Sequence, residues 1–344
     1  MNLSYGWLGR ESSSDQTVGL VVQAAYHLDE FLPLRDELRR RGYSAELLVP
    51  RPPKQPLDRF RPGVRLFNEL LAATALPIVG SSTVEDLTAQ LSSVVVMNDW
   101  GTPALLVSAL RACGTPTYGW VEGVQDYADV DTGQTRRPYR HVDHVFCLGD
   151  YGADQLGDQS RSVVGSERLR RLWAETNSRP TDPHATVSSN FTYGVLTEHR
   201  RDWLRSSAGA CRAAGISWSL SRHAAERGTA LPYRTSRESV SDLLGLSTYF
   251  VGRFSTVCYE ALVRGVELVY HNPHGELEPT FTEALGAFST TTSRTGLQMS
   301  LGAPPRTQAQ VRDAASDFLH HHLRLDGGAS PASLAVDVIE TRLP

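Results

Sequence analysis

The sequence predicts an α/β protein built from two doubly wound domains that face each other across a cleft. The chain has 344 residues, about twice the length of an ordinary domain. Short apolar runs rich in β-branched residues alternate with helical patterns, which is typical of parallel sheets covered by helices. This alternation stops in a polar, proline-containing stretch near the middle of the chain and then starts again.

The first half predicts a parallel sheet that is buried on both faces and joined by right-handed crossovers. A polar N-terminal stretch precedes it. We expect strands at 17–24, 44–49, 76–79, 92–97, 115–121 and 142–148, and helices at 29–41, 103–112 and 150–157.

The second half repeats this pattern after the polar stretch AETNSRPTDPH. We expect strands at 185–189, 216–220, 248–251 and 267–270, and helices at 198–214, 239–244, 256–264 and 307–323. A Gly-rich turn and one more helical stretch follow. The predicted organisation is a first domain at 1–173, a linker at 174–184, a second domain at 185–325 and a tail at 326–344.

Composition excludes several functional classes. With 34 basic and 38 acidic residues the formal charge is −4, too near neutral for a protein that holds nucleic acid by charge. Lys54 is the only lysine and lies in a Pro-rich stretch, which excludes a Walker-type phosphate loop. The sequence also has no HExxH, no GxSxG and no GxGxxG that opens a helix after a strand.

The four cysteines are far apart and form no CxxC pair, so they predict neither a disulfide framework nor a zinc cluster. No run of 18 apolar residues and no signal peptide is recognisable. We therefore expect a cytoplasmic protein, with peripheral association at the inner face of a membrane left open.

Polar residues follow two strands of the first domain, where parallel sheets bind ligands. His27 is a candidate general base or sugar-hydroxyl contact, or simply packs near a helix start that Asp29 caps. Glu122 and Gly123 follow a later strand in the sequence WVEGVQD. A carboxylate there can take a proton from an acceptor hydroxyl, and the glycine permits close approach.

Two other acids compete with Glu122 for this role. Asp126 lies on the acceptor side of the same loop, and Asp99 follows the preceding strand. We favour Glu122 because it directly follows a strand of the sheet, where ligands bind; the alternative is a solvated loop acid, which is common.

The second domain shows the same arrangement. Asn190 follows its first strand, and Arg222 with His223 follows the next, which places a cation and an imidazole where a phosphate can bind. The segment GRFSTVCYEALVRG places Ser255 and Thr256 at a helix start, where they can cap the helix and bind an anion.

Glu260 lies at i+4 from Thr256, on the same face of that helix. We therefore include Glu260 among the candidate ligand-binding residues at this helix start. The alternative is that its carboxylate is solvated.

The order of these segments resembles the GT-B glycosyltransferases, and in particular bacterial capsule and cell-wall polysaccharide transferases of the polysialyltransferase-like and CDP-glycerol glycerophosphotransferase-like kinds. The resemblance covers about residues 17–325. The segments that carry it are VVQAAYHLDEFLPLRDELRRRGYSAELLV, YGWVEGVQD, VVGSERLRRL, SSNFTYG and STVCYEALVRGVELVYHNP.

This resemblance implies two Rossmann-like domains and a sugar transfer from a nucleotide-activated donor to a glycan acceptor. Glu122 resembles the family's base, with His27 as substitute or helper, and Ser255 with Thr256 is similar to its phosphate-binding pair. His223 occupies the place of the phosphate-binding histidine, with Ala224 where the family has proline. The implied reaction is inverting and needs neither a metal nor a cofactor.

Three alternatives stay open. The same fold can transfer a polyol phosphate from a CDP-linked donor to a wall polymer, or epimerise a nucleotide sugar without any acceptor. It can also serve as a non-catalytic scaffold.

Overall fold

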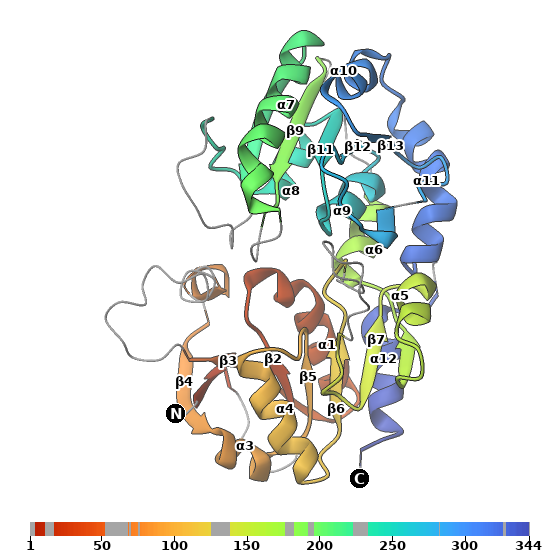
Figure 1. Ribbon diagram of the computed structural model, residues 1–344. Coiled ribbons are helices and arrows are strands. Elements are labelled where there is room, and N and C mark those ends of the chain that lie inside the picture. The colour runs from red at the N-terminus through yellow and green to blue at the C-terminus, as the bar shows by residue number, and fades with distance from the viewer. Residues whose placement is uncertain are drawn as a thin grey trace. The chain divides into compact units, whose positions relative to one another are not determined.

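The structure is a computed structural model, and its chain divides into two compact units (Figure 1). Unit 1 comprises Met1–Gln125, Arg137–Arg168 and Asp326–Pro344, and unit 2 comprises Asp126–Arg136 and Leu169–Leu325. The residues described are 4–10, 17–51, 68, 70–74, 76–124, 138–175, 182–191, 196–222, 233–281, 283–325 and 328–343.

Unit 1 is built on an eight-stranded sheet with the order β4-β1-β3-β2-β5-β6-β7-β8. The neighbouring strands in the run β3-β2-β5-β6-β7-β8 pair in parallel. Strand β1 pairs antiparallel with both β3 and β4. The strands are β1 Ser4–Leu8, β2 Thr17–Val21, β3 Ser44–Pro50, β4 Ile78–Thr83, β5 Leu91–Val96, β6 Thr117–Trp120, β7 His144–Cys147 and β8 Arg161–Val163.

Helices cover both faces of this sheet. The helical elements of unit 1 are η1 Ala25–His27, α1 Leu28–Arg40, α3 Val84–Gln90, α4 Thr102–Ala112, α5 Asp150–Gln155 and α12 Pro331–Glu340, with the first two residues of α6 Glu167–Ala174. Because side chains alternate along a strand, Val18, Leu20 and Val22 share one core with α1 and α12. Helices α3 and α4 contact each other, and α4 packs on β5 and β6.

The antiparallel β1 corrects the prediction that this sheet is entirely parallel. We expected only a polar stretch at the N-terminus, yet Tyr5, Trp7 and Leu8 are buried and β1 lies inside the sheet. A five-residue strand with polar neighbours carries little periodicity, so its sheet partners decide its conformation.

Residues 326–344, expected as a tail, belong to unit 1. The predicted last helical stretch is α12, whose Val336 and Ile339 are fully buried in the core with α1. Arg41 after α1 donates to Asp337 at 2.5 Å and to Glu340 at 2.9 Å, and so links the two helices. The end of the chain therefore completes the first core.

Unit 2 is built on a five-stranded, fully parallel sheet with the order β10-β9-β11-β12-β13. Its strands are β9 His184–Ser189, β10 Ser217–Arg222, β11 Tyr249–Gly252, β12 Glu267–His271 and β13 Ser289–Thr291. Its helical elements are η3 Thr197–His199, α7 Arg200–Ala213, α8 Val240–Gly245, α9 Val257–Val263, η4 Pro279–Phe281, α10 Arg294–Gly302 and α11 Gln308–His322, with the remainder of α6.

One core of unit 2 lies between the sheet and helices α7 and α10, and includes Trp203, Cys211 and Leu297. Cys147, Cys211 and Cys258 are buried, whereas Cys113 is exposed, and burial raises the pKa of the Cys211 thiol to about 12. Among the described residues, no helix is both long and apolar enough to cross a membrane.

Candidate functional site

The topology of unit 1 marks one place for a ligand. From β2 the chain crosses to β3 on one side and later returns to β5 on the other, so the strand order reverses between β2 and β5. Open α/β sheets bind ligands at the carboxyl ends of the strands at such a switch point. Gln23 follows β2 and Asn98 follows β5, and the Asn98 Nδ2 donates to the Gln23 Oε1 at 2.8 Å.

Glu122 and His27 meet at this edge of the sheet. Glu122 follows β6, and His27 ends the short turn η1 that follows β2. The His27 Nε2 lies 3.2 Å from the Glu122 Oε2, and the Tyr26 hydroxyl donates to the same oxygen at 3.3 Å. The side chain of His27 is 1% exposed, whereas that of Glu122 is 29% exposed.

The surroundings of His27 define its tautomer. The backbone N–H of Gln23 donates to the His27 Nδ1 at 3.3 Å, so this nitrogen acts as the acceptor. In a neutral ring the proton then lies on Nε2, which donates to Glu122. The rings of Tyr26 and Phe31 approach the imidazole edge to face, with centroids at 4.7 and 6.4 Å. The buried imidazole of His27 thus fixes the orientation of the Glu122 carboxylate through Nε2.

Asp99, the rival acid after β5, has a different role. It is buried, its Oδ1 accepts from the backbone N–H of Tyr139 at 3.2 Å, and its Oδ2 accepts from that of His141 at 2.7 Å. Both oxygens hold the turn that precedes β7, so Asp99 is a structural carboxylate. Gly123 is buried beside Glu122. Asp126 lies outside the described residues.

Unit 2 has a corresponding switch point between β9 and β11, because β9 is flanked by β10 and β11. Asn190 follows β9 and Arg253 follows β11. The Arg253 guanidinium donates to the Asn190 carbonyl at 2.7 Å, and the Asn190 side-chain amide donates back to the Phe254 carbonyl. The predicted residue Asn190 therefore joins the two loops at the place where topology locates a ligand.

Arg253 and Glu276 form a buried ion pair that sequence reasoning missed. They are 4% and 7% exposed, and the Arg253 Nε donates to the Glu276 Oε2 at 2.6 Å. The Glu276 Oε1 accepts from the backbone N–H of Phe254 at 3.2 Å and from the hydroxyl of Tyr270. Burial and the adjacent carboxylate raise the pKa of Tyr270. Arginine directly after a strand was the available signal, but its partner lies in a distant loop.

Ser255 and Thr256 lie at the start of α9, as the sequence predicts. The Ser255 Oγ accepts from the backbone N–H of Val257 at 3.2 Å, and its carbonyl accepts from Cys258 at 3.0 Å. Thr256 occupies the N-cap position without a side-chain capping bond. Both side chains are partly exposed.

Glu260 is buried, so it is not the solvated carboxylate that the sequence left open as the alternative. It is 1% exposed, and it accepts from the Ser241 hydroxyl at 2.5 Å and from the Arg264 Nε at 3.1 Å. Helix α9 therefore turns this carboxylate toward α8. These contacts argue against direct contact between Glu260 and a ligand.

The predicted cation after β10 is exposed: Arg222 ends that strand. His223, which the sequence analysis paired with it, lies outside the described residues.

Comparisons with known proteins identify the fold. No family profile and no curated protein sequence matches the chain. Solved structures do match over nearly its whole length. Spinosyn forosaminyltransferase SpnP has a TM-score of 0.56 at 14% identity, and the match covers 97% of this chain and 100% of that one.

Two further structures represent other chemistries. The wall teichoic acid polymerase TagF, soaked with CDPG, has a TM-score of 0.54 at 12% identity and covers 96% of this chain and 90% of its own. A UDP-N-acetylglucosamine 2-epimerase from Listeria monocytogenes, named as putative, has a TM-score of 0.59 at 11% identity, with 96% of each chain covered. The chain therefore has the GT-B fold, with two Rossmann-like domains of mostly parallel sheet.

Proposed function

We propose that this chain is a nucleotide-sugar-dependent glycosyltransferase that acts on a hydroxyl of a glycan or cell-surface polysaccharide, by an inverting and metal-independent reaction. The observation that carries the proposal is the partly exposed Glu122 carboxylate at the switch point of unit 1, held by His27 and Tyr26. A carboxylate with this exposure and fixed orientation is suited to general base catalysis.

In the proposed reaction Glu122 takes the proton of the acceptor hydroxyl. At the same time the oxygen of that hydroxyl attacks the anomeric carbon of the donor. The bond between that carbon and the nucleoside diphosphate breaks, and its electron pair stays on the leaving phosphate oxygen. Because attack and departure occur on opposite faces, the anomeric configuration inverts. The proton resides on Glu122 until solvent removes it.

His27 acts as a positioning residue in this mechanism. It is buried, and its two ring nitrogens already contact Gln23 and Glu122. Proton transfer from a substrate is therefore assigned to the more exposed Glu122. The imidazole fixes the direction of the carboxylate, which keeps the base in reach of the acceptor.

The donor is proposed to bind at the switch point of unit 2. The proposed donor contacts are Asn190 after β9 and Ser255 with Thr256 after β11, and the proposed positive groups are Arg222 and His223. Positive groups and backbone N–H groups aimed at the leaving phosphate lower the barrier to its departure. We propose Gly123, which follows Glu122 in the chain, and Asp126 as further residues on the acceptor side.

The similar structures support this class and also its rivals. SpnP is a forosaminyltransferase, TagF is a wall teichoic acid polymerase, and the third is a putative epimerase. The products discriminate between these reactions. Polyol phosphate transfer from a CDP-linked donor leaves CMP and a phosphodiester, and an epimerase needs no acceptor. A scaffold binds no nucleotide.

The first test is thermal unfolding with CMP, CDP, UDP, GDP and TDP, each with and without magnesium. A ligand at 100 times its dissociation constant adds about 2.7 kcal/mol to stability. Each kcal/mol raises the unfolding midpoint by about 2 to 4 °C for domains of this size. A shift with one nucleotide, unchanged by magnesium, supports the proposal, and no shift with any of them favours the scaffold.

The proposal also retains the expected cellular setting. Four free cysteines without a disulfide suit a reducing cytoplasm. A cell-surface polysaccharide acceptor would bring the enzyme to the inner face of the membrane as a peripheral protein.

A further inference from the structure

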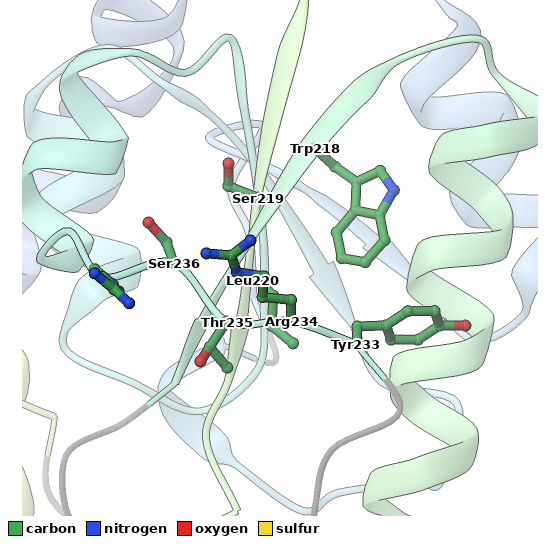
Figure 2. A pocket seen from close by; sticks show the side chains of 8 residues that line it. Trp218, Ser219, Leu220, Tyr233, Arg234, Thr235 and Ser236 are labelled. Atoms are coloured by element: carbon green, nitrogen blue, oxygen red, sulfur yellow. The ribbon is translucent and has the colours of Figure 1, made fainter.

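A pocket lies along edge strand β10 of the sheet of unit 2, in a place that the proposed mechanism does not use (Figure 2). Its volume is about 580 Å³, within the range of small-molecule sites. Edge strand β10 forms one wall and the segment before α8 forms the other. The lining residues are Trp218, Ser219, Leu220, Tyr233, Arg234, Thr235, Ser236 and Arg237.

Backbone groups of β10 contribute to this wall. The N–H of Ser236 donates to the Leu220 carbonyl at 2.8 Å, so the second segment contacts the outer edge of the strand. Backbone groups alternate in direction along a strand, and those of Trp218 therefore project to the same edge as the Leu220 carbonyl. On its other edge β10 is fully paired with β9.

Two aromatic rings form one end of the pocket. The rings of Trp218 and Tyr233 are 5.2 Å apart at 87°, and the Arg212 guanidinium lies 5.8 Å from the centre of the Tyr233 ring. In Figure 2 both rings lie on the side of the pocket next to α7. Perpendicular rings cannot sandwich a flat base between two faces. The two rings contact each other and pack against the core shared with α7, so they form a corner whose pocket-facing surface can contact a puckered sugar ring.

The described lining of the pocket carries positive charge. Its eight residues include two arginines and no acidic side chain. Arg234 and Arg237 are both exposed, and Figure 2 shows Arg234 between the aromatic corner and Ser236. The Ser219 hydroxyl contacts the His184 Nε2 at 3.1 Å, and the Ser236 hydroxyl donates to Glu238 at 3.3 Å. These two hydroxyls are thus already engaged, whereas guanidinium groups beside an aromatic corner match a sugar that carries an anionic group.

We propose that this pocket binds an acidic glycan chain, with a sugar ring against Trp218 and Tyr233 and a carboxylate or phosphate group on Arg234 and Arg237. That this chain is the acceptor polymer rests on the proposed function. The binding itself does not, because the pocket lies wholly within unit 2.

The test is titration calorimetry of the full chain with oligogalacturonate, using neutral maltohexaose as the uncharged probe. The double variant Arg234→Gln/Arg237→Gln removes both charges at exposed positions, so we expect it to fold. We expect wild type to bind oligogalacturonate in a salt-dependent way, and the double variant to bind about tenfold or more weakly, as for lost charge-assisted hydrogen bonds. Trp218→Ala should weaken binding without changing the salt dependence.

Arg205→Gln is the matched control, because Arg205 is an exposed arginine on α7 that pairs with Asp202 at 3.4 Å. It should bind oligogalacturonate like wild type. Equal affinity for the acidic and neutral probes, or unchanged binding in the double variant, would overturn the proposal. So would a double variant that loses nucleotide binding and keeps glycan binding, since the pocket would then hold the donor.

Failure of the proposed function gives a different result. If the wild-type chain binds oligogalacturonate but transfers no sugar from any nucleotide donor, the glycan-binding proposal stands and the transferase proposal is wrong. If the chain transfers sugar but does not bind the acidic probe, the transferase proposal stands and the glycan-binding proposal is wrong.

Discussion

Two acids that follow corresponding strands of the two units, Glu122 after β6 and Glu276 in the loop after β12, have opposite environments. Glu122 in unit 1 is partly exposed, and its described hydrogen-bond partners are a buried imidazole and a tyrosine hydroxyl on one oxygen. Glu276 in unit 2 is buried, and an arginine, a tyrosine and a backbone N–H surround it. A carboxylate whose charge is already compensated holds loops together, whereas one left accessible can accept a proton. Burial and partners, rather than the place at the sheet edge, separate the two roles.

The largest expected effect comes from Glu122→Gln, which keeps the shape of the side chain but removes its basicity. We expect kcat to fall about 10² to 10⁴-fold, the usual contribution of a general base. Nucleotide-dependent thermal shifts and the unfolding midpoint should stay as in wild type.

Asp99→Asn is the control for this change, because Asp99 is a nearby acid whose two oxygens hold backbone N–H groups. It should lower the unfolding midpoint and leave kcat of the folded enzyme nearly intact. If Asp99→Asn abolishes transfer and Glu122→Gln does not, the base has been assigned to the wrong acid.

The buried ion pair of Arg253 and Glu276 in unit 2 is expected to contribute to stability rather than to catalysis. Glu276→Gln leaves the Arg253 guanidinium buried without its counter-charge, and breaking such a pair costs about 3 to 5 kcal/mol of unfolding free energy. Denaturant titration measures this loss.

Glu267→Gln is the matched change at a more exposed pair, in which Glu267 contacts Arg306 at 3.2 Å. The side chains of Glu267 and Arg306 are 15% and 30% exposed, so solvent screens their charges and we expect a smaller loss than for Glu276→Gln. Equal losses for the two variants would show that burial does not distinguish Glu276 and would undo the contrast with Glu122.

His27 sharpens the contrast, because it supports the accessible acid without touching the acceptor in the proposed mechanism. His27→Ala should lower kcat about 10- to 100-fold with little change in KM, as expected when a catalytic group is misplaced. His27→Asn can still donate a hydrogen bond toward Glu122 and should restore part of kcat. Steady-state kinetics of both variants tests this; an Asn variant no better than Ala would mean that the imidazole itself is required.

Glu30 is a third acid, and its effect should be the smallest. It is buried in unit 1 and accepts from the Ser166 hydroxyl at 2.5 Å and from the backbone N–H of Glu167 at 2.7 Å, at the start of α6. Burial raises the pKa of Glu30 above its usual value, against the lowering effect of these hydrogen bonds.

The folded protein thus holds the proton of Glu30 more tightly than the unfolded chain does. The stability that this binding contributes is complete below the unfolded pKa and is lost as pH rises through the raised folded pKa. Glu30→Gln should remove that part of the pH dependence, which unfolding midpoints across an acidic to neutral pH series would detect. Identical pH profiles for the variant and wild type would contradict the raised pKa.

Much of the fold follows from local sequence. The strands at Thr17–Val21 and Leu91–Val96 are apolar runs long enough to predict, and the pattern restarts in unit 2. Glu122, His27 and Asn190 were predicted as candidate site residues because they follow such runs, and a parallel sheet brings the carboxyl ends of its strands to one edge. The strand at Ser4–Leu8 escaped prediction because its sheet partners, rather than its own periodicity, define it.

By itself the sequence determined the α/β class, the duplicated pattern and the candidate residues at the strand ends, because these depend on periodicity and on residues close together in the chain. Only the tertiary structure decided which candidates share an environment. It paired Glu122 with His27, bound Asp99 to backbone N–H groups, turned Glu260 toward α8 and joined Arg253 to Glu276. The reason is physical: exposure and hydrogen-bond partners come from segments distant in the chain, and they decide whether a carboxylate is reactive or structural.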